Sequence, residues 1–153
     1  MASILKVNTI QDATNSNTAI SVDSSGRVTT PVKPAFHAVR TSNQTSAGVG
    51  AFDTATLNVG SHYDTSNYRF TAPVAGLYYF TCSWLPYTTS NGEGNYFRKN
   101  GSQIGQKTYV INADQQITNS HIFELASSDY VDVYFIANGC EYVYSHFSGY
   151  LIG

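Results

Sequence analysis

The side chains that could carry out acid–base or nucleophilic chemistry are few in this sequence and lie far apart. Serine, histidine and aspartate are all present, but no Gly-x-Ser-x-Gly turn supports the catalytic triad of a hydrolase. A glycosidase needs two carboxylates about 5–10 Å apart in a groove, and of the ten acidic residues only Asp129 and Asp132 are close in sequence. We therefore expect a protein that is not an enzyme, and keep a polysaccharide depolymerase as the alternative.

The residues that could bind a metal ion show no familiar spacing either. No pair of histidines forms an HxH or HExxH motif, so each is expected to be solvated or singly hydrogen-bonded. A DxDxDG calcium loop is also absent, although loop carboxylates and carbonyls distant in sequence can hold calcium. We expect no cofactor, and calcium binding stays open as an alternative. The histidines are His37, His62, His121 and His146.

The composition favours partners that carry little charge. Charged residues make up 12% of the chain, the formal net charge is -2, and aromatic residues reach 14%, including 12 tyrosines. Polar surface must come largely from Ser, Thr and Asn, which suits sugars or a second copy of the chain. Nucleic-acid binding is not expected, because Arg98-Lys99 is the only adjacent basic pair.

No segment indicates secretion or insertion into a membrane. Residues 1–14 contain a short apolar stretch that Lys6 interrupts, so they do not resemble a signal peptide. No window approaches the roughly 18 apolar residues of a membrane span. The spacing of Cys82 and Cys140 resembles neither a CxxC motif nor a disulfide framework. We expect both cysteines to be reduced and buried, with a single bridge as the alternative.

Apolar and polar residues alternate with a period of two along most of the chain, which predicts short strands and no helices. Gly, Asn, Asp, Ser and Pro close these stretches. Asn100-Gly101 favours a tight hairpin turn because both residues tolerate positive φ. The pattern predicts an all-β fold, an antiparallel sandwich or jelly roll. The predicted strands span residues 70–71, 76–84, 96–99, 103–111, 117–125, 130–137, 142–144 and 147–152.

Residues 1–33 differ from the rest of the chain because they are rich in Thr, Ser and Asn. Weak strands are predicted at residues 4–10 and 19–23, and the prolines that follow mark a boundary. A lone hairpin is marginally stable in water, so this segment is expected to pair with copies of itself or with another protein. We divide the chain into an anchoring segment, residues 1–33, and a head, residues 34–153. A disordered leader is the alternative.

Several ordered pieces of the head match a known pattern. The most specific is residues 70–80, which read FTAPVAGLYYF. The other pieces are residues 35–40, Asn58 with Tyr63-Asp64, Lys99-Asn100-Gly101, residues 128–131 and residues 147–152. With these pieces the head resembles the globular head of the complement C1q type, a branch of the tumour necrosis factor-like jelly rolls. Ser128 departs from the pattern, since the family has Gly before the Asp of this turn.

The resemblance implies a jelly roll that assembles as a homotrimer, with the termini at the base and variable loops at the far end. The residue pattern agrees, because both faces of the strand at residues 76–84 carry aromatic or apolar side chains. The face with Tyr78, Phe80, Cys82 and Trp84 is expected to be core. The side chains that the resemblance places against the threefold axis are Tyr79, Thr81, Phe147 and Leu151. Ordinary protomer core is the alternative for Tyr79 and Leu151.

Recognition of a ligand is expected on loops carried by the rigid sandwich. Aromatic and amide side chains can stack on a sugar or a protein epitope and form hydrogen bonds with it. The alternative is that these Gly- and Asn-rich loops only turn the chain. The candidates are Tyr87, Asn91, Glu93 and Asn95 in the loop at residues 86–95, with Asn138, Glu141 and Tyr142 in the late loop.

The anchoring segment carries a second resemblance. Residues 5–12 and 20–28 look like the leader of structural proteins of tailed phages, especially those that infect marine cyanobacteria. The resemblance implies a virion protein, assembled in host cytoplasm, that contacts other virion proteins through residues 1–33. We expect a tail or fibre component whose three heads bind a host-surface glycan or protein with avidity. A capsid-decoration or tail-joining protein without a host ligand is the alternative.

Overall fold

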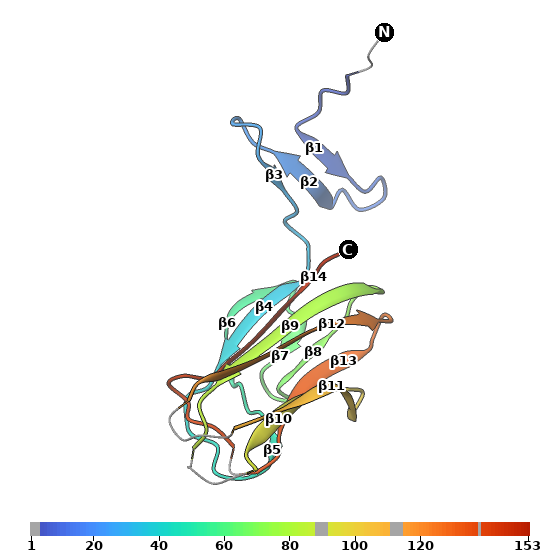
Figure 1. The fold of residues 1–153 in the computed structure, drawn as a ribbon. Helices are drawn as coiled ribbons and strands as arrows, with labels where there is room; N and C mark the ends of the chain where they lie inside the picture. The colour runs from blue at the N-terminus through green and yellow to red at the C-terminus, as the bar shows by residue number, and fades with distance from the viewer. Residues whose placement is uncertain (1–3, 88–91, 111–114, 138) are drawn as a thin grey trace. The chain divides into compact units, whose positions relative to one another are not determined.

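The computed structural model describes residues 4–87, 92–110, 115–137 and 139–153 (Figure 1). Within these residues the regular structure is β-strand, which confirms the all-β prediction. This part of the chain also contains no helix that could span a membrane. The chain divides into two compact units, Met1–Lys33 and Pro34–Gly153.

The first unit contains one small antiparallel sheet. Its strands, in the order β1-β2-β3, are β1 (Thr9–Gln11), β2 (Thr18–Val22) and β3 (Val28–Thr29). The Asp23 carboxylate accepts hydrogen bonds from the backbone N–H groups of Ser25 and Arg27, which closes the turn between β2 and β3. None of the described residues of this unit is buried. Burial of side chains therefore contributes little to its stability.

The second unit is a sandwich of two antiparallel sheets. Sheet I has the order β12-β9-β14-β4-β6, and sheet II has the order β11-β10-β13-β8-β7 with β5 beside β13. The strands of sheet I are β4 (Ala35–Val39), β6 (Thr54–Val59), β9 (Gly76–Trp84), β12 (Ile117–Leu125) and β14 (His146–Leu151). Those of sheet II are β5 (Gly48–Val49), β7 (Tyr63–Asp64), β8 (Arg69–Thr71), β10 (Gly94–Lys99), β11 (Ser102–Tyr109) and β13 (Tyr130–Phe135).

An aromatic core joins the two sheets. Phe36 on sheet I stacks on Phe70 of sheet II, with ring centroids 5.1 Å apart. The face of β9 that was predicted to be core is fully buried, which confirms that prediction: its residues are Tyr78, Phe80, Cys82 and Trp84. Cys82 and Cys140 are both free and buried, and burial raises the pKa of both thiols. Both therefore stay protonated near neutral pH.

Local patterns predicted most of the strands of the head, and the two longest strands most accurately. β9 and β12 coincide with their predicted ranges, and Asn100 and Gly101 form the β10–β11 turn with φ of 52° and 81°. Residues 142–144 were predicted as a strand but form a turn. These residues pair with no strand of either sheet and their side chains are exposed, so tertiary context overrides their β propensity. The strands β3, β5, β6 and β7 were not among the predicted strands.

Candidate functional site

The outer face of sheet II is covered by its own aromatic and charged side chains. Arg98 pairs with Asp132 through two contacts of 2.7 and 2.8 Å, and the rings of Tyr96 and Tyr134 stack 5.3 Å apart. Among the described residues of this sheet, the exposed large apolar side chain is Tyr109 at the end of β11. Cations also lie over rings of this face: Arg69 over Tyr130 at 4.4 Å, Arg98 over Tyr134 at 4.8 Å and Lys107 over Tyr96 at 5.3 Å.

The outer face of sheet I instead presents apolar side chains that the other described residues of the head leave partly or largely exposed. Ile122, Tyr79 and Tyr150 lie side by side in register across β12, β9 and β14. Ile122 is 60% exposed and Tyr150 is 48% exposed. Leu57 and Leu77 lie on the same face and are also exposed. We call Leu57, Leu77, Tyr79, Ile122 and Tyr150 the sheet I patch.

The structure corrects the set of residues expected to face a threefold axis. Tyr79 and Thr81 lie on the outer face of sheet I, where a subunit contact requires them. Phe147 is fully buried in the protomer core instead, and Leu151 packs against the same core. The reason is the period of two along β14, which turns Phe147 and Leu151 inward and Tyr150 outward. Tyr150 therefore belongs to this surface, and Phe147 and Leu151 do not.

Two of the expected ligand-binding residues, Glu93 and Asn95, are fully buried, so their assignment to recognition is also corrected. The Asn95 amide nitrogen lies 3.4 Å from Cys82 Sγ, and its oxygen accepts a hydrogen bond from Asn119 at 3.0 Å. Asn95 belongs to β10 and its side chain points into the sandwich. The two side chains are structural parts of the head and cannot reach a ligand from this position.

The remaining loop candidates do not form one cluster. Tyr87 is exposed, Glu141 is half-buried, and Tyr142 is exposed at the rim of a pocket on sheet I. Tyr87 and Glu141 do not line that pocket. Asn91 and Asn138 lie outside the described residues. Of this set, Tyr142 alone is placed beside a described cavity.

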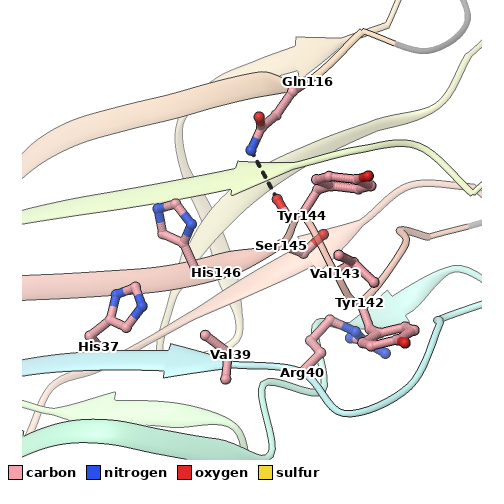
Figure 2. Close-up of a pocket in the computed structure, with 9 residues that line it drawn as sticks. All are labelled: His37, Val39, Arg40, Gln116, Tyr142, Val143, Tyr144, Ser145 and His146. Carbon is pink, nitrogen blue, oxygen red and sulfur yellow. Dashed lines mark hydrogen bonds between the residues drawn. The ribbon is translucent and has the colours of Figure 1, made fainter.

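The pocket of about 440 Å³ opens on the outer face of sheet I, where β4 ends and β14 begins (Figure 2). Gln116 Nε2 donates hydrogen bonds to the Tyr144 carbonyl and to Ser83 Oγ, both at 3.0 Å, which fixes one side of the pocket. The lining residues are His37, Val39, Arg40, Gln116, Tyr142, Val143, Tyr144, Ser145 and His146. Three distant segments supply them, so no local motif in the sequence indicates this site.

Two histidines that the sequence treats as isolated meet in this pocket. The ring centroids of His37 and His146 are 5.1 Å apart, and His37 Nδ1 lies 2.6 Å from Ser148 Oγ. Burial, and secondly the nearby His37, lower the pKa of His146. His146 is therefore neutral at neutral pH and gains its proton only under acidic conditions. Among the described residues no group of three or more His, Cys, Asp or Glu side chains could hold a metal ion.

Asp129 and Asp132 do not form a catalytic pair. The Asp132 carboxylate forms an ion pair with Arg98. Asp129 accepts hydrogen bonds from Asn100 Nδ2 at 2.7 Å and from the Ala126 N–H at 2.8 Å, and the bond from Asn100 is the largest cause of its lowered pKa. Both carboxylates stabilise turns and strands of the head, and neither is free to act as an acid or a base.

Comparison with known proteins identifies the head. Residues 35–152 match the family model of the C1q domain. Complement C1q tumor necrosis factor-related protein 3 of Homo sapiens is 29% identical to the chain over 92 residues, and the Mus musculus protein is equally similar. Each match covers 59% of this chain and 37% of the relative, so the chain spans little more than a third of these proteins.

Solved structures agree with this fold. The globular domain of zebrafish complement 1qA protein matches with a TM-score of 0.63 at 19% identity, covering 79% of this chain and 98% of that domain. Pika GITRL matches with a TM-score of 0.51 at 16% identity, covering 72% and 97%. C1q and tumour necrosis factor-like domains are non-enzymatic ligand-binding modules and typically assemble as trimers. On the family match over residues 35–152, the chain belongs to the C1q domain family.

Proposed function

We propose that this chain is a trimeric, non-enzymatic binding head of a virus particle, a tail or fibre component of a bacteriophage that attaches to a host-surface glycan or protein. The observation that supports trimer formation is the difference between the two outer faces of the sandwich. On the outer face of sheet II, cationic side chains lie over the aromatic rings. On the outer face of sheet I, the sheet I patch is exposed. Contiguous apolar surface of this kind is typical of a protein–protein contact.

A second copy of the chain is the occupant that fits the patch. Full burial of an Ile or Leu side chain stabilises by about 1.5–3 kcal/mol, and Ile122 and Leu57 are 60% and 49% exposed. Roughly half of that stabilisation is therefore still available at Ile122 and at Leu57 when copies associate. If each copy uses the same face around one threefold axis, the three heads point the same way. Their identical ligand sites then lie at one end of the trimer, which increases avidity.

Light scattering of the purified chain tests the assembly. We expect a mass of three times 16.7 kDa, or about 50 kDa. Ile122→Asp places a charge in the contact and should give a species of one chain mass. Tyr109→Asp is the matched control, since Tyr109 is 49% exposed on sheet II, and it should remain trimeric. A well-folded single-chain species for the unaltered protein would refute the trimer.

The first unit is the proposed attachment to the particle. Its described residues bury no side chain, and Ile4, Leu5 and Val28 are 77%, 81% and 65% exposed. A sheet without a core gains stability by docking on another protein, and residues 5–12 and 20–28 resemble the leader of tailed-phage proteins. Antibodies raised against the chain should label purified particles in electron microscopy, and the purified chain should adsorb to host cells. Absence of label would refute the virion assignment, and labelled particles without adsorption would refute host attachment.

A further inference from the structure

The small sheet of the first unit has one face made of aliphatic side chains. Residues directly opposite each other on antiparallel strands point to the same side, as do residues two apart on one strand. Ile10 is opposite Ile20, and Val22 is opposite Val28. Because Ile20 and Val22 are two apart on β2, all four side chains share one side of the sheet. We call Ile10, Ile20, Val22 and Val28 the apolar face of the first unit.

The other face of this sheet is polar. Ser21 on the central strand is opposite Thr9 on β1 and Thr29 on β3, so three hydroxyl groups share this side. An antiparallel sheet with this alternation packs its apolar side on a core and turns its polar side to water. The pattern therefore indicates that the apolar face of the first unit is covered in the working protein.

Within the described residues of the first unit, the apolar face is left partly or largely open. Ile10 and Val28 are 46% and 65% exposed, and Ile20 and Val22 are half-buried. The three strands contain no charged residue. A different protein would gain nothing from charge complementarity with these strands, whereas identical copies can approach each other without repulsion between like charges. The chemistry of the face therefore suits further copies of itself.

The connection to the head keeps copies of this face close together. Thr29 ends β3 and Ala35 begins β4, and six residues of extended chain span at most roughly 20–22 Å. Domains of the C1q family typically assemble as trimers, so a trimeric head holds three first units on short tethers. Such tethers give effective concentrations on the order of millimolar. This favours packing between the tethered copies over capture of a free protein.

We propose that the apolar faces of three first units pack against one another around a threefold axis and form a stem with its own core. β2 is the central strand of each sheet, so Ile20 and Val22 lie closest to the axis. The inference rests on the proposed function, because the trimeric head brings the three units together. The polar face and the exposed residues 4–7 stay outside the stem, where they are available for attachment to the particle.

Cross-linking of the full chain through single introduced cysteines tests this packing. Ile20→Cys lies on the apolar face and Ser21→Cys on the polar face of the same strand, so the two variants are a matched pair. Cys82 and Cys140 are buried, so a short bis-maleimide reacts with the introduced thiol. We expect Ile20→Cys to give covalent dimers of twice 16.7 kDa, or about 33 kDa, because one linker joins two of the three thiols. Ser21→Cys should remain as single chains on a denaturing gel.

Hydrogen exchange followed by mass spectrometry tests the core of the stem. In the unaltered trimer the backbone amides of β2 should exchange at least about tenfold more slowly than in Ile20→Lys, which places a charge in the core. Ser21→Lys, on the polar face, is the control and should exchange like the unaltered chain. Ile122→Asp, which separates the heads, should also accelerate exchange in β2, because the tethering is lost.

Light scattering on the same samples separates failure of the stem from failure of the trimer of heads. A trimer in which Ile20→Cys and Ser21→Cys cross-link equally refutes the stem and leaves the trimer of heads intact. Slow exchange in β2 that persists in single chains of Ile122→Asp also refutes it, since the face would then be covered within one chain. Rapid exchange in β2 of the unaltered trimer overturns the inference and assigns the face to another protein. An unaltered chain that is single and exchanges rapidly refutes the trimer and the stem together.

Discussion

Phe147 and Tyr150 lie three residues apart on β14, on opposite faces of sheet I. Truncating each of them to Ala distinguishes the contribution of the protomer core to stability from that of the subunit contact. Phe147 is fully buried, and its ring centroid lies 4.8–6.0 Å from those of Phe36, Phe52, Tyr63, Phe80 and Phe97. Tyr150 is 48% exposed and contacts the Tyr79 ring at 5.5 Å.

Phe147→Ala should lower the free energy of unfolding by about 4 kcal/mol. Truncation of a buried Phe costs about 3–5 kcal/mol, and the surrounding rings belong to strands of both sheets, which limits their collapse into the cavity. A domain the size of the head has a total stability of roughly 6–18 kcal/mol, so the variant should still fold at room temperature. Its melting temperature should fall by roughly 10–20 °C.

The assay is urea denaturation, followed by tryptophan fluorescence and circular dichroism over a hundredfold range of protein concentration. Loss of a core side chain is intramolecular, so the effect of Phe147→Ala should persist at every concentration. Tyr150→Ala should destabilise only where copies associate, because stability that comes from assembly depends on protein concentration. A loss below about 1.5 kcal/mol for Phe147→Ala, or a loss that disappears on dilution, would show that our assignment of the two faces is wrong.

Two further variants test details of sheet II and its turns. Arg98→Met leaves the Asp132 carboxylate, whose side chain is 5% exposed, without its ion-pair partner. The free energy of unfolding, measured by urea denaturation, should fall by about 3–5 kcal/mol. The double variant Arg98→Met with Asp132→Leu should recover part of this loss, and a near-neutral effect of Arg98→Met alone would contradict the buried pair. Ser128 has a φ of 74° where the family has Gly, so Ser128→Gly should stabilise the head by up to about 1 kcal/mol, because relief of the left-handed conformation exceeds the added entropy of the unfolded chain. A lower urea midpoint for Ser128→Gly would refute that reasoning.

Much of the fold could be predicted from local patterns. β9 and β12 coincide with the predicted ranges because each is nine residues long, enough for the period of two to be plain. The β10–β11 hairpin was predicted from Asn100-Gly101, since positive φ is a property of the residues themselves. The head pattern around residues 70–80 agrees with the C1q family model that matches residues 35–152.

The candidate site could not be predicted in the same way. Phe147 and Tyr150 are both aromatic and stand on one strand, so composition cannot say which of them is core. Arg40 and Gln116 are unremarkable in their own segments, and they line one pocket only because β14 lies between β4 and β9 in sheet I.

The strand pattern, the hairpin turn and the family could be predicted from the amino-acid sequence, because they depend on residues that are neighbours along the chain. The folded structure is needed to show which apolar residues remain exposed on sheet I and which side chains line one pocket. The physical reason is that sheet order and register are set by packing of the whole aromatic core, and shifting one strand by a single residue would exchange its inner and outer side chains.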